Sequence, residues 1–198
     1  MVLPSSMTDP LNKAKIAQRE QVRLRLKTLA APERATASQS LCGMLREQQC
    51  WVKAKSVMLF APLADEPDIW PLLAEALAAG KTVALPSFLS GANTYAARRI
   101  MDPARDLVVG RFGIREPADV SPEIELNQLD LVLVPGVAFD SHGKRLGRGK
   151  GFYDRLLAGV RGTKCGVAFD EQLVDAVPVG PLDIPLNCIL TPSCWIET

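Results

Sequence analysis

An apolar, strand-like run passes directly into a loop rich in glycine and basic residues between positions 131 and 157. Glycines at 147, 149 and 151 let the backbone turn its N–H groups toward an anion and approach it closely, where a Cβ would block the contact. A helix that begins near Gly151 would add unpaired N–H groups and the positive end of its dipole. Positions 143–155 hold five bases and one acid: Lys144, Arg145, Arg148, Lys150, Arg155 and Asp154. This pattern predicts a polyphosphate site.

The loop differs from the two common phosphate-binding motifs. A Walker A loop would need glycine at position 144 and serine or threonine at position 151, where this chain has Lys144 and Gly151. A GxGxxG fingerprint starting at Gly147 would need glycine in place of Phe152. The alternative is a solvated basic turn in which Lys150 and Asp154 form an i,i+4 ion pair, although the base-before-acid order makes such a pair weak.

Three carboxylates elsewhere could join this chemistry. Asp65 and Glu66 follow an apolar strand and precede a helix, where an acid could also serve only the helix dipole. Asp183 lies in a proline-containing apolar loop. Beside a triphosphate, Asp154 and Asp183 would repel the phosphoryl oxygens unless a cation lay between them. Two carboxylates with phosphate oxygens and waters suit Mg²⁺.

The elements that position these residues follow from apolar periodicity. Thr8-Asp9-Pro10 is typical of a capped helix start, and a helical pattern continues to about Ala30. A second helix should follow Pro32, and a third should span 68–79. The expected strands are 56–61, 82–88, 94–100, 131–134, 164–169 and 188–191, with long loops over 101–128. Alternation of helices and buried strands indicates a single α/β domain over 1–198, flexible at 1–8, with a mainly parallel sheet that gathers ligands at its strand carboxyl ends.

The first helix carries a line of bases. Lys15, Arg19 and Arg23 recur at i, i+4 and i+8, where like charges repel unless an anion lies between them. A solvated basic face is the alternative. Val22 and Leu26 are expected on the buried side of this helix.

Composition limits the function classes. The chain has 198 residues, 47% of them hydrophobic and 23% charged, with a net charge of +1, as is ordinary for a globular protein. The positive charge is local, so a general nucleic-acid surface is not expected. No apolar run reaches the roughly 18 residues of a membrane span, and signal-peptide features are lacking, so a cytoplasmic location is expected. Five cysteines without a CxxC pair and a single histidine, His142, suggest reduced structural thiols rather than disulfides or zinc.

The segment 136–155, GVAFDSHGKRLGRGKGFYDR, resembles the signature of the 5-formyltetrahydrofolate cyclo-ligase family, with Phe152 in place of a more frequent tyrosine. Lys15 and Arg19, the Asp65-Glu66 pair and the 182–192 segment also match. The resemblance implies a fold akin to the sugar-phosphate isomerase and CoA-transferase group. It further implies conversion of 5-formyltetrahydrofolate and MgATP into 5,10-methenyltetrahydrofolate, ADP and phosphate through a phosphorylated formyl group. A monomer with small-molecule substrates and without nucleic-acid or membrane partners is expected.

The same resemblance assigns roles to individual residues. The implied ATP contacts are Lys15, Arg19, Arg145, Gly147, Arg148, Gly149, Lys150, Gly151, Phe152 and Tyr153. The implied folate contacts are Ala61, Glu66, Phe112, Arg148, Gly149, Lys150, Gly151 and Phe152. Arg148, Lys150 and Tyr153 would be catalytic, and Asp154 and Asp183 would bind magnesium.

Two other function classes remain open at this point. A phosphosugar isomerase or CoA-transferase-like enzyme on the same fold would bind phosphate without needing ATP or Mg²⁺. A non-enzymatic paralogue would use the loop to bind RNA or a nucleotide, with strong salt dependence and no ADP release.

Overall fold

The computed structural model describes residues 9–89, 91, 94–110 and 113–198, so the segment 1–8 and the expected pterin contact Phe112 lie outside it. The helices are α1 Pro10–Thr28, α2 Ala31–Glu47, α3 Gln49–Lys53, α4 Trp70–Ala78, α5 Pro103–Asp106 and α6 Phe152–Leu157, with 3₁₀ turns η2 Leu126–Gln128 and η3 Asp170–Gln172. The strands are β1 Ser56–Met58, β2 Thr82–Leu89, β3 Thr94–Ile100, β4 Leu107–Val109, β5 Arg115–Pro117, β6 Glu123–Ile124, β7 Leu131–Val134, β8 Ala138–Phe139, β9 Arg145–Leu146, β10 Thr163–Val167, β11 Cys188–Leu190 and β12 Trp195–Glu197.

The main sheet of the described residues has the order β12-β11-β10-β7-β1-β2-β3-β6. Its five central strands are parallel, and the antiparallel strands β12, β3 and β6 complete its edges. The predicted α/β fold with a mainly parallel sheet is therefore confirmed. The predicted βαβ unit is also present, as β1, α4 and β2.

The order in which the chain adds strands to the sheet reverses between β1 and β7. The chain builds outward from β1 through β2 and β3 on one side, and from β7 through β10 and β11 on the other. Loops that leave the carboxyl ends of two such strands diverge to opposite faces and open a crevice between them. The segment after β1 carries Asp65 and Glu66, and the segment after β7 leads to the glycine loop, so the topology brings these two segments together.

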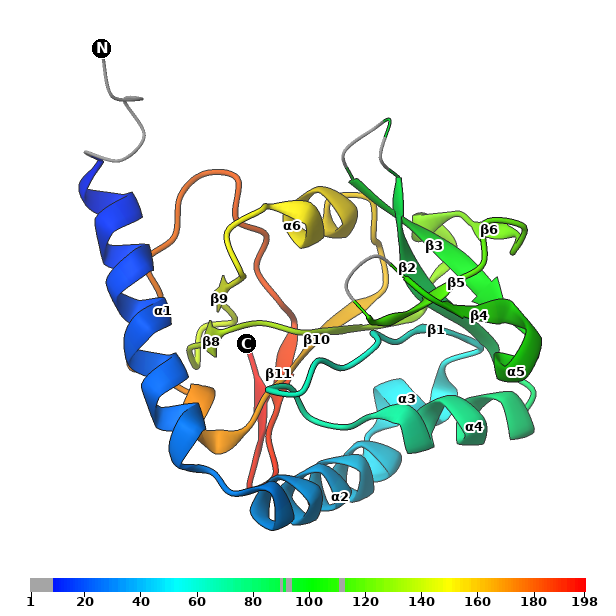
Figure 1. Ribbon diagram of the computed structural model, residues 1–198, viewed down its shortest axis with the longest axis horizontal. Coiled ribbons are helices and arrows are strands. Elements are labelled where there is room, and N and C mark those ends of the chain that lie inside the picture. The colour runs from blue at the N-terminus through cyan, green and yellow to red at the C-terminus, as the bar shows by residue number, and fades with distance from the viewer. Residues whose placement is uncertain (1–8, 90, 92–93, 111–112) are drawn as a thin grey trace.

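Helices cover both faces of the sheet (Figure 1). The pair α2 and α4 lies along one face, where Leu41, Leu45 and Leu72 pack into a fully buried core. On the other face α6 packs Leu156 and Leu157 against the strands. The four residues of β7 are all buried, as the aliphatic run 131–134 predicts.

Helix α1 begins where the sequence predicts. The Asp9 side chain accepts a hydrogen bond of 3.1 Å from the Leu11 backbone N–H, which caps the first turn. Val22 and Leu26 face inward and pack against the β8–β9 hairpin and Phe169, which sets α1 beside the start of the glycine loop. Within the described part of the chain, no helix is both long and apolar enough to cross a bilayer.

The segment 101–128 is more regular than expected. It contains α5, the antiparallel hairpin β4–β5 and the short strand β6 in place of continuous loops. The prediction of long loops was wrong because it relied on the proline, glycine and charge content of the segment. A hairpin of two three-residue strands needs only one short apolar run and a turn. Here Gly113, with a φ of 71°, allows that turn.

Candidate active site

The glycine loop joins β9 to α6 with the backbone that its glycines allow. Gly149 and Gly151 have φ values of 101° and 65°, a backbone region that residues with a Cβ rarely adopt. Gly147 is restricted differently, because a Cβ there would lie 2.8 Å from the Arg145 Nη1 atom. The backbone therefore favours glycine at 149 and 151, and a side chain at 147 would require Arg145 to move. The loop carries the exposed Arg148 and Lys150 side chains.

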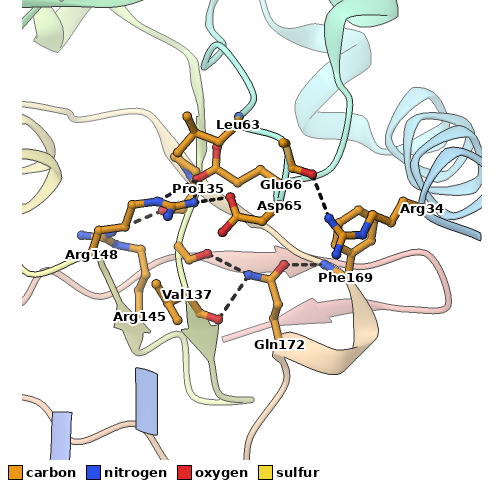
Figure 2. Close-up of polar contacts among 12 residues, drawn as sticks. Arg34, Leu63, Asp65, Glu66, Pro135, Val137, Arg145, Arg148, Phe169 and Gln172 are labelled. Atoms are coloured by element: carbon orange, nitrogen blue, oxygen red, sulfur yellow. Dashed lines mark hydrogen bonds and ion pairs between the residues drawn. The ribbon is translucent and has the colours of Figure 1, made fainter. Parts of the chain in front are cut away.

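Arg148 bridges the loop to the segment after β1. Its Nη2 atom lies 2.7 Å from Asp65 Oδ1 and 2.9 Å from Glu66 Oε1, as Figure 2 shows. The other Glu66 oxygen accepts a 3.0 Å hydrogen bond from the Leu63 backbone N–H. Burial raises the pKa of Glu66 in spite of this guanidinium. Ala61 is half-buried in the same segment. The expected ATP loop and the expected folate carboxylate thus meet at one guanidinium.

Arg145 points into the protein rather than into the loop. Its side chain is 3% exposed, and its Nη2 atom lies 2.8 Å from Asp154 Oδ1. Its Nη1 atom also donates to the Pro135 carbonyl. Asp154 therefore pairs with Arg145. The alternative of a solvated turn with a Lys150–Asp154 ion pair is not what the structure shows. Arg145 ties the start of the loop to α6 and to the end of β7.

Helix α1 faces the loop with two of its three aligned bases. Lys15 Nζ lies 2.6 Å from Asp183 Oδ2, and Arg19 Nε donates to the Gly147 carbonyl at 2.8 Å. The Asp183 carboxylate also accepts from the Gly180 backbone N–H at 2.6 Å. Arg23 is exposed. A solvated face therefore describes Arg23 alone, because Lys15 and Arg19 are directed to predicted site residues.

The donor set suits magnesium together with a polyphosphate. The Asp154 and Asp183 side chains are 18% and 20% exposed, and each uses one oxygen in an ion pair with a base. No cluster of three or more acid, histidine or cysteine side chains within the described ranges could hold a metal by itself. Phosphate oxygens and waters would have to complete the shell, as is usual for Mg²⁺ at nucleotide sites.

An aromatic group lies against the loop. Phe152 is 5.0 Å from Phe88 and 5.4 Å from Tyr95 between ring centroids, and Tyr95 is 5.7 Å from Tyr153. Burial raises the pKa of Tyr153 well above its usual value, so its phenol stays neutral. Sequence reasoning missed Phe88 and Tyr95. They come from β2 and β3, and only the antiparallel register that pairs them brings them beside α6.

Two further side chains, Gln172 and Arg34, bond to backbone groups near Asp65 and Glu66 (Figure 2). Gln172 is 1% exposed; it donates to the Gly136 and Val137 carbonyls and accepts from the Phe169 backbone N–H. Arg34 donates to the Ala64 carbonyl at 2.8 Å and to two carbonyls near the end of α1. Both side chains satisfy backbone groups of loops that flank the site, and no sequence pattern marks them.

We expect Gln172→Ala to lower the free energy of unfolding by about 2–4 kcal/mol, because it leaves buried backbone groups unpaired and opens a small cavity. Urea denaturation would measure this loss. The matched control is Gln39→Ala on the exposed side of α2, where a change within about 0.5 kcal/mol is expected. Equal stability of the two variants would contradict the supporting role.

The molecule is an α/β protein with helices on both faces of a mainly parallel sheet, and its base-rich glycine loop lies beside the Asp65 and Glu66 carboxylates. The sequence profile of the 5-formyltetrahydrofolate cyclo-ligase family matches residues 11–192. The chain therefore belongs to this family of enzymes.

Individual relatives agree with this assignment. The chain is 35% identical over 180 residues to the 5-formyltetrahydrofolate cyclo-ligase of Escherichia coli K12, covering 87% of this chain and 97% of that protein. It is 28% identical to the mouse enzyme over 191 residues, covering 91% and 94%. The solution structure of Aquifex aeolicus 5,10-methenyltetrahydrofolate synthetase superposes with a TM-score of 0.83 at 36% identity, covering 92% of each chain.

Proposed function

We propose that this protein is an ATP- and magnesium-dependent 5-formyltetrahydrofolate cyclo-ligase that forms 5,10-methenyltetrahydrofolate, ADP and phosphate. Family membership and the names of the relatives support the substrate. The observation that carries the proposal is the position of Arg148, within 3 Å of the carboxylate expected to hold the pterin while it belongs to the loop expected to hold the triphosphate. Phosphoryl transfer to the formyl group requires these two ligands to meet at such a point.

The proposed reaction needs no acid or base of unusual strength. The formyl oxygen attacks the γ-phosphorus of ATP, ADP leaves, and the formyl carbon becomes part of an N5 iminium that carries a phosphate. N10 then attacks that carbon, and the C–O bond breaks as phosphate departs with the N10 proton. The ring product keeps one positive charge over N5, the bridging carbon and N10.

The protein would supply position and charge. Arg148 and Lys150 would neutralise the phosphoryl oxygens as charge shifts toward ADP, an effect that is strong in a site shielded from water. Glu66 would accept N–H donors of the pterin edge. Lys15 and Arg19 would contact the triphosphate from α1. Magnesium, held by Asp154 and Asp183 with the phosphates, would neutralise further charge on the triphosphate when bound.

A spectrophotometric assay of methenyltetrahydrofolate formation tests the proposal directly. Purified protein should form the product only when 5-formyltetrahydrofolate, ATP and Mg²⁺ are all present, with one ADP released per turnover. A phosphosugar isomerase or CoA-transferase-like activity would need neither ATP nor Mg²⁺. A binding protein would release no ADP, and its affinity for phosphate would fall steeply with salt. Absence of product under the complete conditions would refute the proposal.

Glu66→Gln is expected to weaken 5-formyltetrahydrofolate binding by about 1.5–3 kcal/mol, the scale of hydrogen bonds to charged groups. The amide keeps the volume but loses the charge and one acceptor. ATP affinity should change little, because Arg148 keeps Asp65 as a partner. Calorimetry with each ligand separately measures both effects, and Glu75→Gln in a surface ion pair is the control. Unchanged folate affinity, or an equal loss for ATP, would remove Glu66 from the pterin site.

A further inference from the structure

Glu116 on β5 is a partly buried carboxylate. Among the described residues it forms no hydrogen bond or ion pair, whereas Asp65, Glu66, Asp154 and Asp183 all pair with bases. Burial, which is the largest effect, and the charge of Asp119 raise the pKa of Glu116. Shielding an unpaired carboxylate from water costs free energy. A group kept in this state is suited to a ligand that brings the missing positive charge.

The Glu116 carboxylate lies over the backbone of Gly110. A Cβ added at Gly110 would lie 2.4 Å from Glu116 Cδ and within 2.8 Å of both carboxylate oxygens, so a side chain at position 110 would displace the acid from its present place. The Gly110 backbone N–H donates to the Ile114 carbonyl at 2.7 Å, which closes the turn beside it. The carboxylate therefore lies against the backbone of its own hairpin while it stays partly open to solvent.

This place adjoins the proposed folate site. β5 packs against β2 and β3, which supply Phe88 and Tyr95 of the aromatic group next to Phe152. After burial, the negative charges of Glu116 and Glu66 both raise the pKa of Tyr95, so the two carboxylates lie near one phenol. Glu66 is already paired with Arg148, whereas Glu116 pairs with no base in the described part of the chain.

We propose that Glu116 is a second folate-contacting carboxylate, which pairs with the positive charge that spreads over N5, the bridging carbon and N10 during ring closure. The inference rests on the proposed function, because the ring of 5-formyltetrahydrofolate is neutral at these atoms and only the reaction makes it cationic. A carboxylate that meets this charge stabilises the transition state and the product more than the substrate, which is the requirement for lowering the barrier.

The test compares two ligands that differ in this charge. Glu116→Gln should weaken binding of cationic 5,10-methenyltetrahydrofolate by about 10-fold or more, the loss expected for a charge-assisted contact, while binding of 5-formyltetrahydrofolate changes by less than about 3-fold. The loss of activity should appear as a lower kcat, with little change in KM. Glu125→Gln, which changes an exposed acid directly after β6, is the control and should change neither affinity.

A second variant reaches the same carboxylate without changing it. Gly110→Ala should displace Glu116 and reproduce the selective loss, and thermal melting would show that each variant folds. Equal losses for the two ligands, or no loss in a folded Glu116→Gln protein, would overturn the role of Glu116 while the parent chain still cyclises its substrate. A parent chain that forms no product would instead overturn the proposed function, and this inference with it.

Discussion

Arg148→Ala and Lys150→Ala are each expected to lower turnover by about 10²-fold or more, because each removes a positive charge placed against phosphoryl oxygens in the transition state. Arg148 should show the larger effect, since the structure also uses it to neutralise the buried Glu66 carboxylate. Without that guanidinium the pKa of Glu66 rises further. Folate binding by Arg148→Ala should therefore fail at a higher pH than in the parent as the carboxylate protonates.

Steady-state kinetics with both substrates, and folate titrations across pH, measure these effects. Arg161→Ala is a matched control, because Arg161 is an exposed base that precedes the amino end of β10, whereas the loop follows the carboxyl end of the parallel strand β7. It should keep full activity. Near-normal turnover in both loop variants would remove the loop from the mechanism. Loss of activity in Arg161→Ala would instead indicate a general effect of net charge.

Asp183→Asn is expected to raise the Mg²⁺ concentration for half-maximal activity by at least about 10-fold, because one of two charged oxygen ligands becomes a neutral one. Lys15 Nζ, now 2.6 Å from this carboxylate, would lose its partner but remain able to contact phosphate. Activity titrated with Mg²⁺ at saturating ATP gives the measurement. A titration that superposes on that of the parent would refute the shared-magnesium assignment.

The companion variant Asp154→Asn carries an additional cost. Asp154 is the partner of Arg145, whose side chain is nearly inaccessible and whose Nε atom has no hydrogen bond. Removing one member of a buried pair leaves an uncompensated charge and destabilises a protein by about 3–5 kcal/mol. Unfolding should therefore be measured beside the Mg²⁺ titration. A shift in the metal requirement without loss of stability would separate the two roles of Asp154.

Several elements of this protein are predictable from the sequence, because the effects that form them act between residues close together in the chain. Helix α1 was expected at Pro10 because a capping acid and an N-terminal proline act within one turn, and β7 was expected because four aliphatic residues need burial on both faces. The glycine loop was recognisable for the same reason, since backbone conformation at Gly149 and Gly151 depends on the residue itself. Motif spacing then indicated the family that the sequence comparisons show.

Only the tertiary structure decided which charges meet. Arg145 and Arg148 are three positions apart in one basic loop, yet the first is buried against Asp154 and the second reaches Glu66 across 82 positions of the chain. Phe88 and Tyr95 lie beside α6 through strand register, which depends on partners distant in the sequence. Such pairings are set by the order of strands in the sheet and by desolvation, and neither acts on a local stretch of residues.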